Sequence, residues 1–283
     1  MTEREDLIEA VTRRVLAVLA GDAEGECSDC HGSCASHCAD KVRAMVDEGA
    51  SRISYNGRGG EIPADLARYI DHTLLAPNTT PSSIDRLCEE ALEYGFAAVC
   101  VNPVWVRRAV QKLRGSKVKV ASVVGFPLGA NATETKVMEA RRALREGARE
   151  IDMVINIGLL KERQYDQVRR DIARVVDACR EVGAVCKVII EAALLTDEEK
   201  VIACRLAQEA KADFVKTSTG FGPGGATVYD VALMRETVGP EMGVKASGGI
   251  HTTEEAKEMI AAGATRIGAS AGISIVGGGG ADG

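Results

Sequence analysis

The chain has 283 residues, of which 46% are apolar and 27% charged, as is ordinary for a soluble globular protein with a sizeable core. Its net charge of −6 and aromatic content of 4% argue against partners such as nucleic acid or an anionic membrane surface. No apolar run approaches the ~20 residues of a membrane span, and the acidic start MTEREDLIEA lacks the features of a signal peptide. We therefore expect a cytoplasmic protein whose nine cysteines are mostly reduced.

The first 62 residues have a different pattern from the rest of the chain. Residues 1–22 contain an amphipathic helix, because apolar side chains recur on one stripe between Leu7 and Leu19. Residues 23–62 form a small cysteine-rich module that ends in GRGGEIP, a linker by its composition. We therefore predict a helical, cysteine-rich extension ahead of the main domain.

Four cysteines of this module are closely spaced: Cys27, Cys30, Cys34 and Cys38. Four thiolates are enough for a structural zinc ion or an iron–sulfur cluster, although the spacing is not that of a standard zinc finger. Reduced thiols on a helix and a local disulfide are the alternatives. The sequence leaves all of these open.

From residue 69 onward, short β-rich runs alternate with helical patterns. Their near-continuous hydrophobicity is typical of parallel strands that are covered on both faces. Eight such units over about 210 residues have the count and size of a (β/α)₈ TIM barrel of the α/β class. The predicted strands are 69–75, 97–103, 117–126, 150–158, 185–191, 213–218, 243–249 and 265–270.

Helix boundaries between these runs support the same fold. Thr80-Pro81 starts one helix, and Thr196 and Thr252 each precede a glutamate by three residues, as in a capping box. Gly95, Gly183 and Gly263 follow helical segments. A doubly wound open sheet is the rival fold, but no G-x-G-x-x-G follows the first strand. We expect the barrel domain over residues 63–276 and a flexible, glycine-rich tail over 277–283.

Two lysines lie inside apolar runs, Lys187 in VCKVIIE and Lys216 in DFVKTSTG. Adjacent strands would bring both into the barrel interior, together with Asp152 of EIDMVINIG. Two buried ammonium groups repel, and desolvation also favours the neutral amine, so the pKa of one lysine should fall. A neutral amine attacks carbonyls and forms a Schiff base. The alternative is a structural ion network with Asp152 or Glu191.

Small residues cluster at the predicted carboxyl ends of the last three strands, in STGFGPGG, SGGI and GAS. Backbone N–H groups can approach an anion closely there, and the loops after strands 7 and 8 are the usual phosphate site of such barrels. The alternative is that the glycines only form tight turns. A phosphorylated carbonyl compound is the substrate class that fits.

The motifs GFPLGA, EIDMVINIG, VCKVIIE, DFVKTSTGFG and VKASGGI together resemble the deoxyribose-phosphate aldolase family of class I aldolases. The resemblance covers residues 65–276 and implies a TIM barrel, which agrees with the independent reading of the strands. It also implies reversible cleavage of 2-deoxy-D-ribose 5-phosphate to glyceraldehyde 3-phosphate and acetaldehyde, without a cofactor for catalysis. A class I aldolase for another sugar phosphate and a non-catalytic scaffold are the alternatives.

The resemblance also implies roles for single residues. By motif, Lys187 resembles the Schiff-base lysine, Lys216 the neighbour that lowers its pKa, and Asp152 the carboxylate that relays protons. Substrate-binding positions are implied at Asp71, Cys100, Gly220, Gly248, Gly249 and Ser270.

The first helix resembles the encapsulation peptides of enzymes carried in bacterial microcompartments. This resemblance implies a shell protein as a partner and a location in the compartment lumen, where a volatile aldehyde would be retained. The alternative is a helix that packs in an oligomer or against the barrel. We expect a homo-oligomer, with a dimer as the first candidate.

Overall fold

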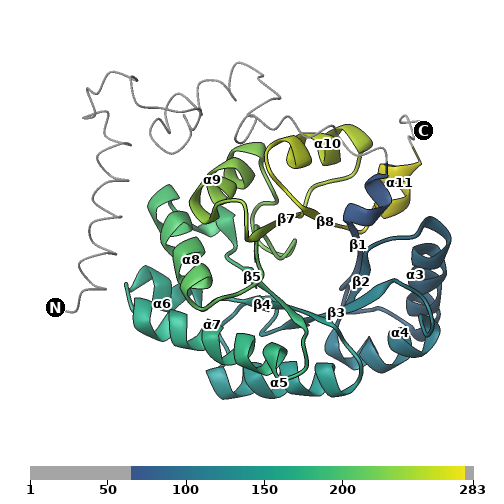
Figure 1. Cartoon of the computed structure of the whole chain (residues 1–283), viewed down its shortest axis with the longest axis horizontal. Coiled ribbons are helices and arrows are strands. Elements are labelled where there is room, and N and C mark those ends of the chain that lie inside the picture. The colour runs from purple at the N-terminus through teal and green to yellow at the C-terminus, as the bar shows by residue number, and fades with distance from the viewer. Residues whose placement is uncertain (1–64, 278–283) are drawn as a thin grey trace.

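The computed structural model describes residues 65–277, and these form a closed barrel of eight parallel strands in the order of the sequence (Figure 1). This confirms the predicted (β/α)₈ fold. The cysteine-rich extension lies outside the described residues, so the limit at residue 63 stays a prediction. The strands are β1 Ile70–Leu74, β2 Ala98–Val101, β3 Lys119–Val124, β4 Glu150–Val154, β5 Val185–Ile189, β6 Phe214–Lys216, β7 Gly243–Ser247 and β8 Arg266–Ala269.

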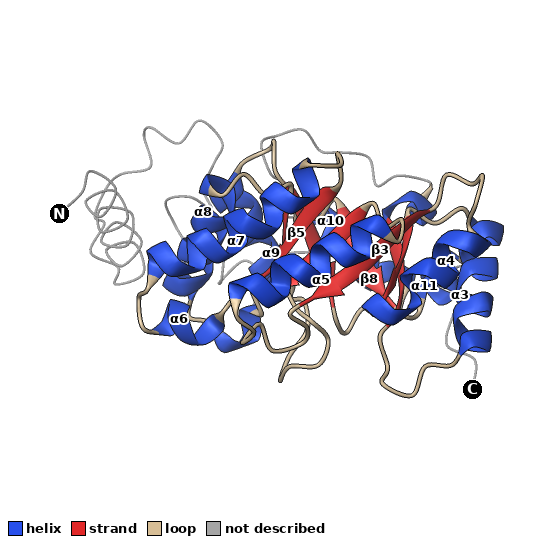
Figure 2. Ribbon diagram, turned by 90° about the horizontal axis from the view of Figure 1, so that it is seen from below, coloured by secondary structure: helices blue, strands red, loops and turns tan. Residues whose placement is uncertain are grey.

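Helices connect successive strands and form a layer outside the barrel (Figure 2). The α-helices are α3 Pro81–Tyr94, α4 Val106–Lys112, α5 Thr133–Arg145, α6 Ile157–Lys161, α7 Tyr165–Arg180, α8 Asp197–Glu209, α9 Val228–Val238, α10 Thr253–Ala261 and α11 Gly272–Val276. Within residues 65–277, the short 3₁₀ helices are η4 Leu66–Tyr69, η5 Pro103–Trp105 and η6 Ala192–Leu194.

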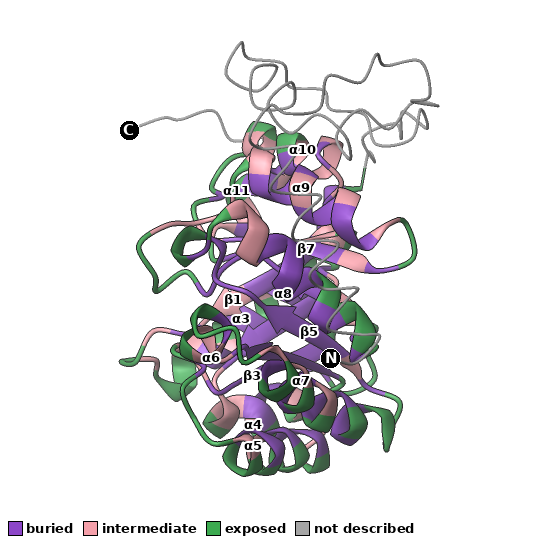
Figure 3. Ribbon diagram, turned by 90° about the vertical axis from the view of Figure 1, so that its left-hand side faces the viewer, coloured by how far each residue is buried: buried purple, intermediate pink, exposed green. Residues whose placement is uncertain are grey.

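The main core lies between the strands and the helices, and the strands are almost entirely buried (Figure 3). Outward-facing strand residues such as Ile151, Val188 and Val244 belong to this core. A second, small apolar cluster consists of Leu75, Cys100, Ala121 and Val123, with Phe126 packed against it. Since strand residues alternate between faces, this second cluster occupies the barrel interior on the side of β1 to β3.

Side-chain caps start the helices where the sequence predicts them. The Thr80 hydroxyl accepts a hydrogen bond from the Ser83 N–H, and Thr196 and Thr252 form complete capping boxes with Glu199 and Glu255. Gly95 ends α3 in the left-handed conformation. Gly183, three residues beyond Arg180, is also left-handed with φ 65°, and the Ala184 N–H donates to the Cys179 carbonyl at 2.9 Å, which closes the end of α7 as the sequence predicts.

The eight strands confirm the predicted runs, but each is shorter than its run. The largest difference at a carboxyl end is at 150–158, where β4 ends at Val154 and Asn156 caps the short helix α6. The Asn156 side chain accepts a hydrogen bond from the Leu159 N–H, which competes with continued strand pairing. Hydrophobicity alone does not reveal such a local cap.

A buried ion pair fixes the end of β4 against the outer helices. Lys136 of α5 donates to the Val154 carbonyl at 2.9 Å and to Asp171 of α7 at 2.5 Å, and Thr133 also donates to Asp171. Lys136 is fully buried. The contact holds two helices and one strand end in place two residues from Asp152.

Candidate active site

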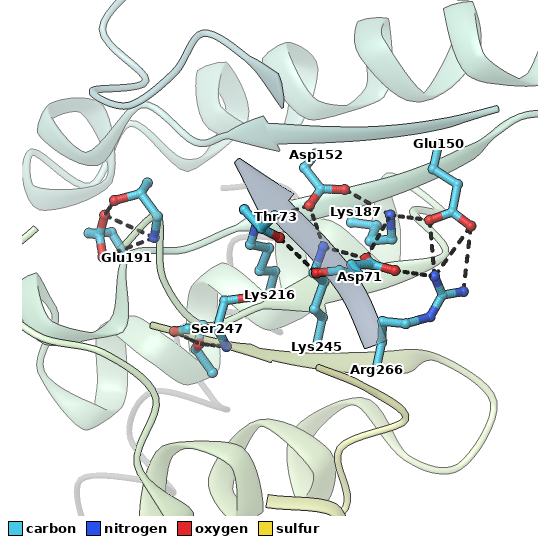
Figure 4. A network of polar contacts seen from close by, with 12 residues as sticks. Asp71, Thr73, Glu150, Asp152, Lys187, Glu191, Lys216, Lys245, Ser247 and Arg266 are labelled. Atoms are coloured by element: carbon cyan, nitrogen blue, oxygen red, sulfur yellow. Dashed lines mark hydrogen bonds and ion pairs between the residues drawn. The ribbon is translucent and has the colours of Figure 1, made fainter. Parts of the chain in front are cut away.

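Charged side chains from six strands meet inside the barrel (Figure 4). We call this set the interior charge cluster; its members are Asp71, Glu150, Asp152, Lys187, Lys216, Lys245 and Arg266. Each side chain points inward because strand residues alternate between the two faces of the sheet. Barrel enzymes carry their chemistry at the carboxyl ends of such strands.

Asp152 lies at the centre of the cluster and binds three lysines. Its Oδ1 accepts a hydrogen bond from Lys187 at 2.8 Å. Its Oδ2 accepts from Lys216 at 2.9 Å and from Lys245 at 2.7 Å. The structure therefore brings together all three residues that the sequence singled out for chemistry, and adds Lys245.

A second group of contacts surrounds Lys187. Its Nζ lies 2.5 Å from Glu150 and 3.8 Å from Asp71. Arg266 completes the group, with its guanidinium 2.6 Å from Asp71 and 3.2 Å from Glu150. Lys187 thus has three carboxylates within 4 Å, whereas Lys216 has one.

Lys245, Glu150 and Arg266 have no role predicted from the sequence. A signal was present, since each is a charged residue within a predicted strand run. Glu150 is two residues from Asp152, so both point to the same face of β4.

The pKa of Lys187 is raised above the usual lysine value. Burial lowers it, but the charges of Asp152, Glu150 and Asp71 outweigh burial. This direction is opposite to the lowering that the sequence analysis expects from Lys216, because three carboxylates surround Lys187; the predicted catalytic role of Lys187 stays a prediction.

The pKa of Lys216 is lowered. Burial is the main cause; Asp152 opposes it, and the charge of Lys245 adds to it. Lys245 is the register partner of Lys216 on the neighbouring strand. The sequence predicted repulsion between Lys187 and Lys216, whereas in the structure the cation that lowers the pKa of Lys216 is Lys245. Lys216 is the lysine whose environment favours the reactive neutral amine.

The two carboxylates nearest these lysines are held ionised. The pKa values of Asp71 and Asp152 are lowered, because the charges of the surrounding lysines together outweigh burial. Asp71 contacts Lys245 at 2.5 Å and Arg266 at 2.6 Å. Its predicted role in substrate binding stays a prediction, and its contacts make it part of the interior charge cluster.

Cys100 belongs to the small apolar cluster opposite the charges. It is fully buried, and burial raises the pKa of its thiol to about 11. Its neighbours Leu75, Val123 and Phe126 give this side of the interior an apolar surface. Cys100 is therefore a neutral thiol in an apolar wall next to the charged groups.

The residues predicted to bind phosphate lie at the carboxyl ends of β6, β7 and β8. Gly220, Gly248 and Gly249 all have positive φ values, from 76° to 88°, which glycine adopts without strain. Ala226 N–H donates to the Gly248 carbonyl at 2.9 Å, so the loops after β6 and β7 are joined. Ser270 is exposed directly after β8. The structure thus places all four positions at one end of the barrel.

Glu191 anchors the loop after β6. Its carboxylate accepts hydrogen bonds from the Thr219 N–H, at 3.3 Å, and from the Thr219 hydroxyl. Glu191 itself adopts the left-handed conformation, with φ 54°, which is uncommon for a residue with a side chain. Strain of this kind persists where surrounding contacts impose it and is frequent at functional sites.

Two aromatic rings from distant loops meet at the same end of the barrel. Phe126 follows β3 and Phe221 follows β6, and their ring centroids are 5.3 Å apart in an edge-to-face arrangement. Phe221 is half exposed. The rings link the apolar wall to the glycine-rich loop.

Between residues 65 and 277, no group of three or more His, Cys, Asp or Glu side chains is arranged to hold a metal ion. Cys27, Cys30, Cys34 and Cys38 lie outside the described residues. Over the same part of the chain, every helix is too short or too polar to cross a bilayer.

Fold and site together define a barrel enzyme with buried amines beside a carboxylate and glycine-rich loops at one end. Residues 66–277 match the model of the DeoC/LacD family of aldolases. The chain belongs to this family.

Relatives cover the same part of the chain. A deoxyribose-phosphate aldolase of Thermococcus kodakarensis is 64% identical over 214 residues, which are 75% of this chain and 96% of the relative. One of Enterococcus faecalis is 61% identical over 214 residues, which are 76% and 97%. The deoxyribose phosphate aldolase of Aeropyrum pernix, whose structure is described as uniquely tetrameric, has a TM-score of 0.73 at 35% identity, covering 83% of this chain and 97% of that one.

Proposed function

We propose that the protein is a class I aldolase that reversibly cleaves 2-deoxy-D-ribose 5-phosphate to D-glyceraldehyde 3-phosphate and acetaldehyde through a lysine Schiff base. Two observations support this substrate: the family and its relatives at 61–64% identity, and the glycine-rich strand ends that suit a phosphate. The single observation that carries the mechanism is the position of Lys216, which donates a hydrogen bond to Asp152 and is the register partner of Lys245 on the neighbouring strand.

We assign the Schiff base to Lys216 in place of Lys187. Lys187 is held in its charged form by three carboxylates, and a charged amine is not a nucleophile. Lys216 has one carboxylate, which it shares with two other lysines, and its pKa is lowered. It is also nearer the carboxyl end of the barrel, since it pairs with Ile189 and not with Lys187.

The chemistry follows from these positions. Neutral Lys216 adds to the C1 aldehyde, and the resulting carbinolamine takes up one proton and loses water to give a protonated imine. The imine accepts the electron pair of the C2–C3 bond as that bond breaks, while the C3 hydroxyl loses its proton and becomes the aldehyde of glyceraldehyde 3-phosphate. The remaining enamine takes a proton at C2, and hydrolysis releases acetaldehyde and restores Lys216. Asp152 accepts a hydrogen bond from this amine, and Lys245 donates to the same Asp152 oxygen, so the two residues can relay protons through these steps.

Reductive trapping tests the assignment. Borohydride added with 2-deoxyribose 5-phosphate should attach a two-carbon adduct to Lys216, which peptide mass spectrometry would locate. Lys216→Met should abolish both the adduct and turnover. An adduct on Lys187 in the wild-type protein would instead support the assignment made from the sequence motif and refute this one.

A related class I aldolase for a different sugar phosphate is the second candidate. It would retain the lysine adduct but release no acetaldehyde from 2-deoxyribose 5-phosphate. An enzymatic assay for acetaldehyde therefore separates the two. A non-catalytic scaffold would show neither result.

The N-terminal residues support two further proposals, and both lie outside the described residues. Cys27, Cys30, Cys34 and Cys38 provide thiolates for zinc or an iron–sulfur cluster, and metal analysis of the chain with and without residues 1–60 tests this. The stripe on residues 1–22 supports encapsulation in a microcompartment through a shell protein. A reporter fused to residues 1–22 that stays diffuse beside assembled shells would contradict it.

We also propose a cytoplasmic homo-oligomer. The relative from Aeropyrum pernix, described as tetrameric, supports self-association, while the sequence made a dimer the first candidate. Light scattering of the purified protein distinguishes a monomer, a dimer and a tetramer.

A further inference from the structure

The charges inside the barrel do not cancel. Among residues 65–277, the interior charge cluster joins four cations to three carboxylates through N–O distances of 3.8 Å or less. The cations are Lys187, Lys216, Lys245 and Arg266, and the carboxylates are Asp71, Glu150 and Asp152. Full ionisation would leave one positive charge in excess, and an uncompensated charge away from water is unfavourable. The cluster therefore favours the loss of one proton from a cation.

Arg266 cannot supply that proton, because a guanidinium does not deprotonate in proteins. Of the three lysines, Lys187 has three carboxylates within 4 Å, Lys245 has two and Lys216 has one. The groups that face Lys216 are Asp152 of β4, Lys245 of β7 and the neutral thiol of Cys100 on β2, while its register neighbour on β5 is the apolar Ile189. Lys216 is therefore the lysine from which a proton is lost most easily.

Arg266 lies away from the reacting groups. It is the first residue of β8, at the end of the strand opposite the glycine-rich loops. Its guanidinium binds Asp71 at 2.6 Å and Glu150 at 3.2 Å and lies 5.7 Å from the centre of the Phe214 ring. These contacts hold a permanent positive charge against two of the three carboxylates. The arginine therefore compensates part of their negative charge, and less of it remains to stabilise protonated lysines.

We propose that Arg266 is a positioning residue whose permanent charge keeps Lys216 unprotonated, acting through Asp71 and Glu150 without touching the substrate. This inference rests on the proposed function, in which Lys216 forms the Schiff base. Without the arginine, three lysines would balance three carboxylates, and Lys216 would keep its proton. Because Arg266 adds a fourth cation to three carboxylates, the three lysines cannot all stay protonated without an uncompensated positive charge.

The test is the pH dependence of adduct formation on Lys216. Acetaldehyde and cyanoborohydride would be added to the full chain, and the rate of labelling at Lys216 followed by mass spectrometry across pH. The acid limb of this profile is the pH range in which labelling rises as Lys216 loses its proton. Arg266→Met should shift this limb to higher pH by about one pH unit or more. One unit corresponds to about tenfold slower labelling at neutral pH, with recovery at high pH. Arg266→Lys keeps the charge and should keep the wild-type limb.

A double variant restores the balance in another way. Glu150→Gln with Arg266→Met leaves three lysines against two carboxylates, so the excess of one positive charge returns, and the acid limb should return toward its wild-type position. Glu150→Gln alone should leave the limb in place or move it downward. If Arg266→Met does not fold, Glu150→Gln and the double variant still test the proposal.

Three outcomes would overturn the proposal: an Arg266→Met limb that does not move while labelling slows equally at every pH, a double variant that remains shifted like Arg266→Met, or an upward shift in Glu150→Gln alone. These differ from failure of the proposed function. If the wild-type protein carries no label on Lys216, the Schiff-base assignment fails; a labelled Lys216 with an unmoved limb in Arg266→Met refutes the role of Arg266 alone.

Discussion

Lys245 is the register partner of Lys216, and both lysines donate to the same oxygen of Asp152, at 2.7 and 2.9 Å. Two ammonium groups that share one carboxylate oxygen repel each other, and one carboxylate cannot fully compensate both. Burial is the main cause of the lowered pKa of Lys216, and the charge of Lys245 adds to it, which leads to the first prediction.

Lys245→Met should raise the pKa of Lys216, because it removes the positive charge that disfavours the protonated amine. The acid limb of Lys216 labelling should therefore shift to higher pH, with slower labelling at neutral pH and recovery in base. The partly exposed pair Lys161–Glu199 supplies the control, and Lys161→Met should leave the limb unchanged. An unshifted limb in Lys245→Met would show that the two lysines are not coupled.

Lys187→Met should destabilise the fold. It leaves Glu150 and Asp152 short of a buried cation, and breaking a buried ion pair from one side costs about 3–5 kcal/mol. Urea denaturation measures the loss. Lys161→Met, in a partly exposed pair, should change the free energy of unfolding by about 1 kcal/mol or less. Equal stabilities of the two variants would contradict a structural role for Lys187.

Gly129→Ala should destabilise the protein more than Gly183→Ala. Both glycines have positive φ, 68° and 65°, which costs about 1–2 kcal/mol for alanine. At Gly129 the added Cβ would also overlap the Ile155 carbonyl, whereas at Gly183 it meets open space. The overlap should add about 1–3 kcal/mol in thermal or urea unfolding. A difference near zero would mean that the loop after β3 moves freely away from β4.

Glu191→Ala should weaken substrate binding more than it slows turnover. The change removes the carboxylate that holds Thr219, next to Gly220 in the predicted phosphate loop. Hydrogen bonds to a charged group contribute about 1.5–3 kcal/mol, so we expect KM to rise about tenfold or more with a smaller change in kcat. Leu194→Ala, at an exposed neighbour in η6, is the control. A fall in kcat at constant KM would place Glu191 in the chemistry instead of the loop.

Much of the fold could be predicted because its signals are local. Runs such as 185–191 and 243–249 are apolar enough to be recognised as buried strands, and Thr196 and Thr252 mark helix starts through contacts three residues away. The inward direction of Asp152, Lys187 and Lys216 also follows from strand alternation alone. The cap at Asn156 was missed because a polar side chain ends β4 within an apolar stretch.

The sequence by itself determined the barrel, the family resemblance, and the fact that lysines and Asp152 face one interior. Only the tertiary structure shows which charged groups surround each lysine, and the proposed assignment of the Schiff base to Lys216 rests on those contacts. The stagger between strands pairs Lys187 with Asp152 and Phe214, but pairs Lys216 with Lys245. This register surrounds Lys187 with three carboxylates and leaves Lys216 with one. Because charge interactions depend on distances between strands far apart in the chain, the motifs alone could not predict them.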